Sequence, residues 1–271
     1  VCINGGVQER GNFSAAAGFG FTQGKQGIFS TFSAFIEMVI SEATMARLNN
    51  ANLICHFSHA GVDEIADNTC HYGINIFLAN SGFAEEERPP RLYFAADALQ
   101  LKTLVNNVWN DEGIRYIFST RSKVPYILKE DGSKFFGEGY QFEAGKDEVI
   151  REGSAGYVVS YGEILYRALD AVERARKSGI DVGLINKATL NVVDEAAVAK
   201  AGQTGFVIVA EGQNQNTGLA SRYGSWLLER GFSPKYRMMA VVRPGDGGIP
   251  EHVAHQGLDA DSILKQIQAL A

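Results

Sequence analysis

The sequence predicts an α/β protein built from two open, mostly parallel twisted sheets flanked by helices. Short apolar, β-branched runs alternate with amphipathic helical segments along the 271 residues. This alternation is typical of parallel strands whose sheet is covered on both faces. A stretch rich in glycine and charge, residues 128–151, interrupts the rhythm and indicates that a second unit follows.

The expected elements follow from local composition. Strands are expected where four or more β-branched, aromatic or other apolar residues run together between polar segments, at Leu53–Phe57, Ile74–Leu78, Arg91–Phe94, Tyr116–Ser119, Ala155–Ser160, Val182–Asn186 and Gly205–Ala210. Helices are expected where apolar residues recur every three or four positions, at Ser33–Leu48, Ala95–Val108, Tyr161–Ser178, Asp194–Ala199 and Gly218–Arg230. The opening VCINGG reads as a buried strand and turn, so we expect the chain to begin inside a domain.

The breaks in this pattern predict two domains. The first is expected over residues 1–130 and the second over residues 153–271, joined by a linker at residues 131–152. A chain of this length is long enough to bury a substantial core in each.

Composition excludes several classes of function. The formal net charge is -6, with 25 basic and 31 acidic residues, whereas nucleic-acid binding normally needs a clustered basic face. No apolar run approaches the ~20 residues that span a bilayer, and no signal segment is visible. Cys2, Cys55 and Cys70 form no CxxC pair and are expected to be small buried residues in a reducing compartment. We therefore expect a cytoplasmic protein that binds neither nucleic acid nor membrane.

The segment HFSHAGVDEIADNTCHYG, residues 56–73, concentrates histidines and carboxylates between apolar runs. Three interpretations remain open from these residues alone: a solvated loop, a metal site, or a substrate loop at a strand end, where ligands of open α/β sheets bind. The metal site is the weakest, because the histidine spacings match no helical or finger pattern. Glu9 in INGGVQERG is equally ambiguous, since a helix start favours a carboxylate with or without a chemical role.

Four segments, taken in order, resemble the pyrimidine-binding domain of the transketolases, which are thiamine-diphosphate enzymes. These segments are GVQERGNFSAAAGFG, IFSTFSAFIEMVISEATMARLN, CHFSHAGVDEIADNTCH and STRSKVP. From about Gly153 the chain resembles the transketolase C-terminal domain. The resemblance implies a two-domain chain whose pyrimidine-binding domain lacks its beginning before Val1.

The resemblance assigns cofactor roles to three residues. Glu9 matches the glutamate that hydrogen-bonds N1′ of the cofactor's aminopyrimidine, and its desolvation among glycines and alanines would suit proton sharing with a ring nitrogen. Phe32 and Phe35 match the aromatic residues that pack on the pyrimidine ring, and their spacing places them on one helical face. Core packing is the alternative for Phe35.

The resemblance also assigns substrate roles. His59 and His71 match catalytic histidines that line the donor channel, and Arg121 matches the arginine that binds the substrate phosphate. A structural salt bridge is the alternative for Arg121. This chain departs from the family at Ala60, where many transketolases have aspartate, and over Ile65–Tyr72, where the motif keeps only its aspartate and histidine. These departures put the usual pentose-phosphate specificity in doubt.

The family holds the cofactor diphosphate through Mg²⁺ with a GDG motif and a later asparagine on a separate domain. Gly245-Asp246-Gly247 lies too near the chain end to match, and it reads as a turn. The resemblance thus implies a diphosphate-binding domain on a partner chain or missing segment, in a homodimer or heterotetramer.

The expected reaction is transfer of a two-carbon ketol unit from a ketose phosphate to an aldose. The alternatives are another thiamine-diphosphate enzyme, such as a deoxyxylulose-phosphate synthase or a dihydroxyacetone-forming relative, and a non-catalytic assembly subunit.

Overall fold

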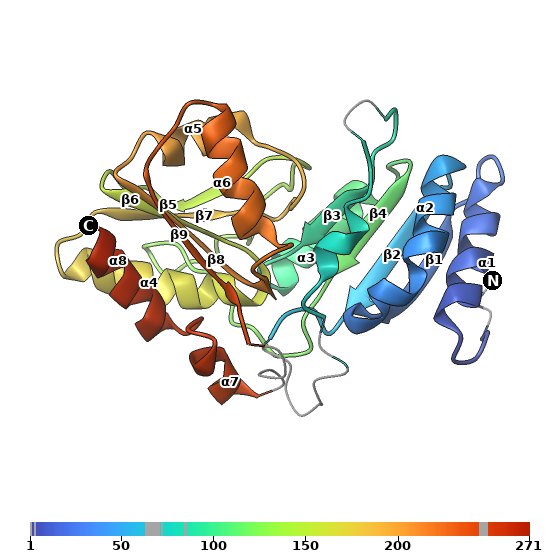
Figure 1. Cartoon of the computed structure of the whole chain (residues 1–271), viewed down its shortest axis with the longest axis horizontal. Coiled ribbons are helices and arrows are strands. Elements are labelled where there is room, and N and C mark those ends of the chain that lie inside the picture. Colours follow the sequence, from blue (N-terminus) through green and yellow to red (C-terminus); the bar gives the residue numbers. More distant parts are fainter. Residues whose placement is uncertain (1, 3, 63–70, 72, 84–85, 244–248) are drawn as a thin grey trace.

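The computed structural model describes residues 2, 4–62, 71, 73–83, 86–243 and 249–271. Two sheets flanked by helices lie side by side, one formed by the first half of the chain and one by the second (Figure 1). This arrangement confirms the predicted fold class.

The first sheet has strands β1 (Gly27–Phe32), β2 (Leu53–Ser58), β3 (Arg91–Phe94) and β4 (Ile114–Phe118), in the order β1-β2-β4-β3. All pairings are parallel. Alternate residues face opposite sides of a strand, so Phe57 packs with the helices of one face and Ile54 with those of the other. The first face is covered by α1 (Glu9–Phe21), the 3-10 helix η1 (Ser33–Val39) and α2 (Ile40–Leu48), and the second by α3 (Ala98–Val108).

The second sheet has the order β5-β7-β6-β8-β9, with β5 (Glu148–Arg151) antiparallel to β7 (Val182–Asn186) and the other pairings parallel. The remaining strands are β6 (Gly156–Ser160), β8 (Phe206–Asn214) and β9 (Lys235–Val241). Helices α5 (Glu195–Gly202) and α6 (Leu219–Glu229) cover one face, and α4 (Leu165–Lys177) and α8 (Ala260–Leu270) cover the other (Figure 1). Short helices η2 (Ile76–Ala79), η3 (Gly162–Ile164) and α7 (Pro250–His255) complete the fold.

One hydrophobic core runs through both units. Phe94 at the end of β3 lies 5.8 Å from the ring of Tyr161, which follows β6. Backbone hydrogen bonds also cross the junction, from Phe94 N to Ala188 O and from Leu190 N to Leu92 O. The two domains therefore pack through buried apolar surface as well as through polar groups.

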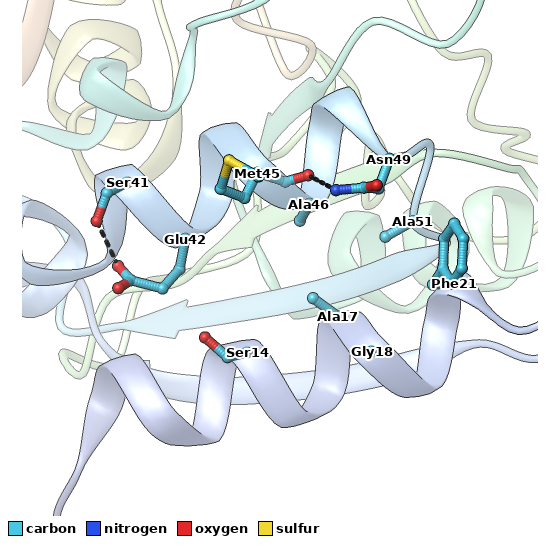
Figure 2. Close-up of a pocket in the computed structure, with 10 residues that line it drawn as sticks. All are labelled: Ser14, Ala17, Gly18, Phe21, Ser41, Glu42, Met45, Ala46, Asn49 and Ala51. Atoms are coloured by element: carbon cyan, nitrogen blue, oxygen red, sulfur yellow. Dashed lines mark hydrogen bonds between the residues drawn. The ribbon is translucent and has the colours of Figure 1, made fainter.

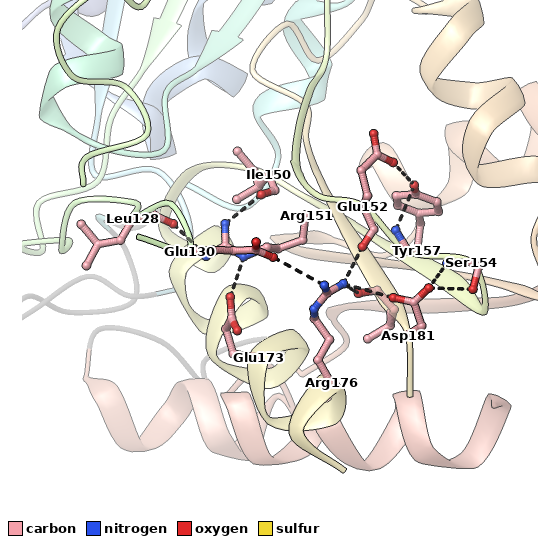
Figure 3. A network of polar contacts seen from close by, with 12 residues as sticks. Leu128, Glu130, Ile150, Arg151, Glu152, Ser154, Tyr157, Glu173, Arg176 and Asp181 are labelled. Carbon is pink, nitrogen blue, oxygen red and sulfur yellow. Dashed lines mark hydrogen bonds and ion pairs between the residues drawn. The ribbon is translucent and has the colours of Figure 1, made fainter. Parts of the chain in front are cut away.

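The connecting segment, residues 119–147, joins β4, the last strand of the first sheet along the chain, to β5. Two arginines attach it to the second sheet (Figure 3). Buried Arg151 donates to Glu173 Oε1, Ile150 O and Leu128 O. Arg176 donates to Glu152 O and pairs with Asp181 and Glu130. Because each guanidinium can donate five N–H groups, one side chain ties residues that are far apart in sequence.

The structure differs from the sequence prediction in several elements. The strand predicted at Ile74–Leu78 is wrong: a 3-10 helix begins at Ile76, because a short apolar run fits either conformation. The expected linker 131–152 contains β5, which belongs to the second sheet. The described residues of the opening segment form no strand, and Cys2 is exposed, whereas Cys55 is buried as predicted. Cys70 lies outside the described residues.

In the described part of the chain, no helix has the length and apolar character needed to cross a membrane.

Candidate functional site

Four of the residues predicted for the site form one cluster at the carboxyl end of the first sheet. Strand β1 ends at Phe32, which lies opposite Ser58 at the end of β2. The Phe32 ring centroid lies 4.0 Å from that of His59 and 5.2 Å from that of His71. Phe35 lies 5.9 Å from both Phe32 and His71. Segments that are far apart in sequence therefore meet because parallel strands end at the same edge.

Glu9 begins α1, and the packing of α1 places it at the same edge. Asn52 N donates to Gly20 O near the start of β2, while the Phe13 ring lies 5.1 Å from Phe29 in the middle of β1. The helix therefore runs antiparallel to β1, and its first residue lies toward the end where β1 stops. In this chain alone Glu9 is partly buried, and Val7, two residues before it, is 96% exposed.

Arg121 follows β4 by three residues and is exposed at this edge. Ser119, two residues earlier, donates its backbone N–H to Phe57 O, which fixes the start of the loop.

Two other features named from the sequence, Asp67 and the Gly245–Gly247 turn, lie outside the described residues.

His59 has an unusual backbone conformation, with φ of 61°. Non-glycine residues seldom adopt this left-handed region, and functional sites are where such strain concentrates. The His59 Nδ1 atom lies 2.8 Å from Ser58 Oγ. The next residue, Ala60, is fully buried and its N–H donates to Ser119 O, so the position that is aspartate in many transketolases is a core position here.

Two further residues at this edge lie outside the set predicted from sequence. His56 lies between Ser30 Oγ at 3.0 Å and Ser119 Oγ at 2.9 Å, linking β1, β2 and the end of β4. Burial lowers the pKa of His56, and the charge of His59 lowers it further, so the neutral imidazole is favoured. Its presence in the histidine-rich segment is the sequence signal that could have found it.

Glu163 is the second residue, and it comes from the second domain. Its carboxylate is buried against Gly61 and Gly212, where an added Cβ would overlap it. No sequence pattern indicates this contact, because it joins residues about a hundred positions apart.

A separate groove of about 500 Å³ lies between α1 and α2 (Figure 2). Its floor contains Ala17 and Ala46, and the exposed side chains of Phe21 and Met45 lie beside it. None of the predicted site residues lines this groove. Among the described residues, no group of three or more His, Cys, Asp or Glu side chains is placed to hold a metal ion.

Comparison with known proteins identifies relatives along the whole chain. Residues 145–263 match the family model of the transketolase C-terminal domain. An uncharacterised transketolase-family protein of Sinorhizobium fredii is 33% identical over 177 residues, which cover 64% of this chain and 49% of that protein. The match thus spans about half of that relative's length. One subunit of the apulose-4-phosphate transketolase of Actinobacillus succinogenes is 23% identical over 97% of this chain and 82% of its own length.

The fold has a close counterpart among solved structures. A split-gene transketolase described as an inactive beta4 tetramer superposes with a TM-score of 0.83 and 23% identity, over 98% of this chain and 82% of that chain. The family match in the second domain, the full-length relatives and the shared two-sheet architecture agree. Residues 145–263 therefore form a transketolase C-terminal domain, and the chain as a whole is similar to transketolase subunits and shares their two-sheet fold.

Proposed function

We propose that this chain is one subunit of a thiamine-diphosphate-dependent transketolase, and that it contributes the half of the active site that binds the aminopyrimidine ring. The observation that carries this proposal is the cluster of Phe32, Phe35, His59 and His71 at the edge where α1 presents Glu9. The activity would be transfer of a two-carbon ketol unit from a ketose phosphate to an aldose.

The residues at this edge suit an aminopyrimidine ring. Phe32 and Phe35 are both partly exposed and their rings lie at 26° to each other, so they offer apolar surface to a flat heterocycle. Glu9 provides a carboxylate that can hold a proton at the ring nitrogen N1′. When bound, the cofactor would supply the carbon nucleophile and the electron sink for cleavage of a bond next to a carbonyl.

The remaining residues would act on the sugar. His59 and His71 would donate to or accept from the hydroxyl groups of a donor. Arg121, exposed at the entrance, has a guanidinium whose planar fork suits a phosphate dianion. The buried Ala60 cannot contact a donor hydroxyl as an aspartate would, so donor preference is expected to differ from that of ordinary transketolases.

Mg²⁺ and the diphosphate would be held by a partner chain or by a domain outside this sequence. A relative described as one subunit of a transketolase, and a neighbour described as a tetramer of a split-gene transketolase, support an assembly of several subunits. In that assembly the partner would cover Glu9 and complete its desolvation.

The test is turnover by the chain assembled with its diphosphate-binding partner, assayed with defined ketose phosphates, thiamine diphosphate and Mg²⁺. Glu9→Gln removes the carboxylate but keeps its size, and it is expected to abolish turnover while cofactor binding, followed by calorimetry, persists. Near-normal turnover of this variant would refute the assignment of Glu9.

Glu42→Gln is the matched control, since Glu42 forms an ion pair with Arg10 beside Glu9 but lies in the separate groove. It should retain turnover. Product identity then separates the alternatives. Pyruvate-dependent formation of deoxyxylulose phosphate indicates a synthase, and formation of dihydroxyacetone by transfer of the two-carbon unit to formaldehyde indicates a dihydroxyacetone-forming enzyme. No product with any donor indicates a non-catalytic assembly subunit.

A further inference from the structure

The end of β8 in the second domain reaches into the first domain beside the histidine cluster. Gln213 is fully buried, and its side-chain amide donates from Nε2 to Gly73 O at 3.1 Å and accepts from Ile76 N at 3.2 Å. The next residue, Asn214, donates its backbone N–H to Ile74 O at 2.8 Å and its side-chain Nδ2 to Asn75 Oδ1. Two consecutive residues of the second sheet thus bind the segment 73–76.

Gly73 connects this segment directly to the cluster. Its N–H donates to His59 O at 2.8 Å, its carbonyl accepts from Gly61 N at 2.9 Å, and it lies two residues after His71. It also packs so closely on Ser33, the residue after Phe32, that an added Cβ would overlap Ser33. The same Gly73 carbonyl that accepts from Gly61 N also accepts from Gln213, so one carbonyl joins the two domains.

The second domain contacts the His59 turn from another side through Glu163. The buried carboxylate lies between Gly61 of the turn and Gly212, the residue before Gln213. Gly61 has φ of 92°, and a side chain there would be both strained and overlapped by the carboxylate. The backbone of residues 59–61 is therefore confined by Gly73 and by Glu163.

We infer that Gln213 is a positioning residue: through Gly73 it holds His59 and His71 in their arrangement around Phe32, so the C-terminal domain sets the geometry of a site whose reacting groups lie in the other domain. A buried amide with both its donor and its acceptor satisfied has one favoured orientation. Loss of that amide leaves Ile76 N without its acceptor and Gly73 O with Gly61 N as its remaining donor, which lets the segment shift.

The test uses the five histidines of the intact chain as reporters. The Cε1–H signals of wild type, Gln213→Leu and Gln213→Glu are compared by NMR, with assignments from single His→Gln variants. Both substitutions are expected to move the signals of His59 and His71, while those of His252 and His255 on α7 stay fixed. Gln213→Glu matches the native side chain in size and still accepts from Ile76 N, so it reports on the Gly73 bond if the leucine variant does not fold.

Asn191→Ala is the matched control. Asn191 also bridges the two domains, donating to Asn80 Oδ1 and Pro90 O and accepting from Leu92 N, near the start of β3, and none of these bonds involves Gly73. It should lower stability without moving the His59 and His71 signals. Unchanged signals in the Gln213 variants, or equal movement in Asn191→Ala, would overturn the inference.

A second readout rests on the proposed function. In the assembled enzyme, Gln213→Leu should lower kcat/KM by about 100-fold, since misplacing reacting groups by about 1 Å costs that much. Asn191→Ala should retain kcat/KM. If the assembly has no transketolase activity, the histidine shifts still decide the positioning role, so failure of one conclusion is distinguishable from failure of the other.

Discussion

The carboxyl end of the first sheet and the interior of the second domain differ in how far their side chains are exposed to solvent. At the first, Glu9, Phe32, Phe35, His59 and His71 are all partly exposed. In the second, charged and amide groups are enclosed and paired: Lys187 Nζ lies 2.8 Å from Asp147 Oδ1, and both side chains are fully buried.

A neighbouring network in the second domain shows the same enclosure. Glu148 accepts from Tyr140 OH, Gln100 Nε2 and Asn186 Nδ2, which brings groups from α3, the connecting segment and β7 to one carboxylate. In the second domain, paired polar groups such as Lys187 and Asp147 hold the backbone in place. The carboxyl end of the first sheet leaves its polar groups partly exposed.

The largest loss in the free energy of unfolding is expected when the buried ion pair of Lys187 and Asp147 is broken. Lys187→Met leaves the Asp147 carboxylate enclosed without its partner, which should cost about 3–5 kcal/mol in the free energy of unfolding. Lys200→Met is the control, because Lys200 and Glu152 form an exposed pair worth at most about 1 kcal/mol. Urea unfolding of both variants tests the comparison, and equal losses would contradict it.

The next effect is a pH dependence of stability that originates in the second domain. Burial raises the pKa of Glu148 to about 7 and that of Asp147 to about 6. The folded state therefore binds more protons than the unfolded state from about pH 4.5 upward, so stability falls as the pH rises to about 7. At about 1.4 kcal/mol for each unit of pKa, the fall for Glu148 is of the order of 3 kcal/mol.

Denaturant unfolding between pH 5 and pH 8 measures this dependence. Glu148→Gln removes one of the two titrating groups and should make the curve shallower, most clearly above about pH 6, where Asp147 contributes little. A variant curve as steep as that of the wild type would assign the dependence to other groups.

A smaller loss of stability is expected at the contact between Gly61 of the first domain and Glu163 of the second. Gly61→Ala should cost about 2–3 kcal/mol, because the methyl group adds overlap with Glu163 to the strain of a positive φ. Gly132→Ala, also at positive φ but in open space, should cost only about 1 kcal/mol. Thermal unfolding of the two variants compares them, and similar losses would show that Glu163 can move aside.

The smallest effect on stability is expected at the accessible edge. Arg121→Ala should change the free energy of unfolding by less than about 0.5 kcal/mol, because the residue is exposed. In the assembled enzyme it should raise KM for a phosphorylated donor and leave an unphosphorylated donor unaffected. Lys123→Ala, two residues away and also exposed, is the control for the loss of positive charge; an equal rise in KM would point to general electrostatic attraction.

Much of the fold and of the cluster could be predicted because the information is local in sequence. Apolar runs such as Val182–Asn186 indicate buried strands, and the structure confirms that strand at those residues. Short motifs place Phe32, Phe35, His59 and His71 in one site, and they lie together.

The missed elements lack such local signals. Strand β9 carries Lys235 and Arg237 at the edge of its sheet, so its first half looks polar. In β1 the adjacent Ser30 and Thr31 interrupt a short apolar run directly before a helical pattern. The contact of Gln213 with Gly73 joins residues 140 positions apart, and a glutamine has no sequence feature that reveals its partner.

Strand β1 also has a practical consequence for anyone producing this protein. It ends its sheet, with β2 as its one neighbour among the described strands, and Ile28 on it is 59% exposed. Phe19 and Phe21 on α1 are more than half exposed close by. An uncovered strand edge beside apolar side chains can pair with the same edge of another chain, which promotes aggregation of newly synthesised chains. If the proposed partner chain covers this edge, yield should depend on the ratio in which the two chains are synthesised, and co-expression should raise it.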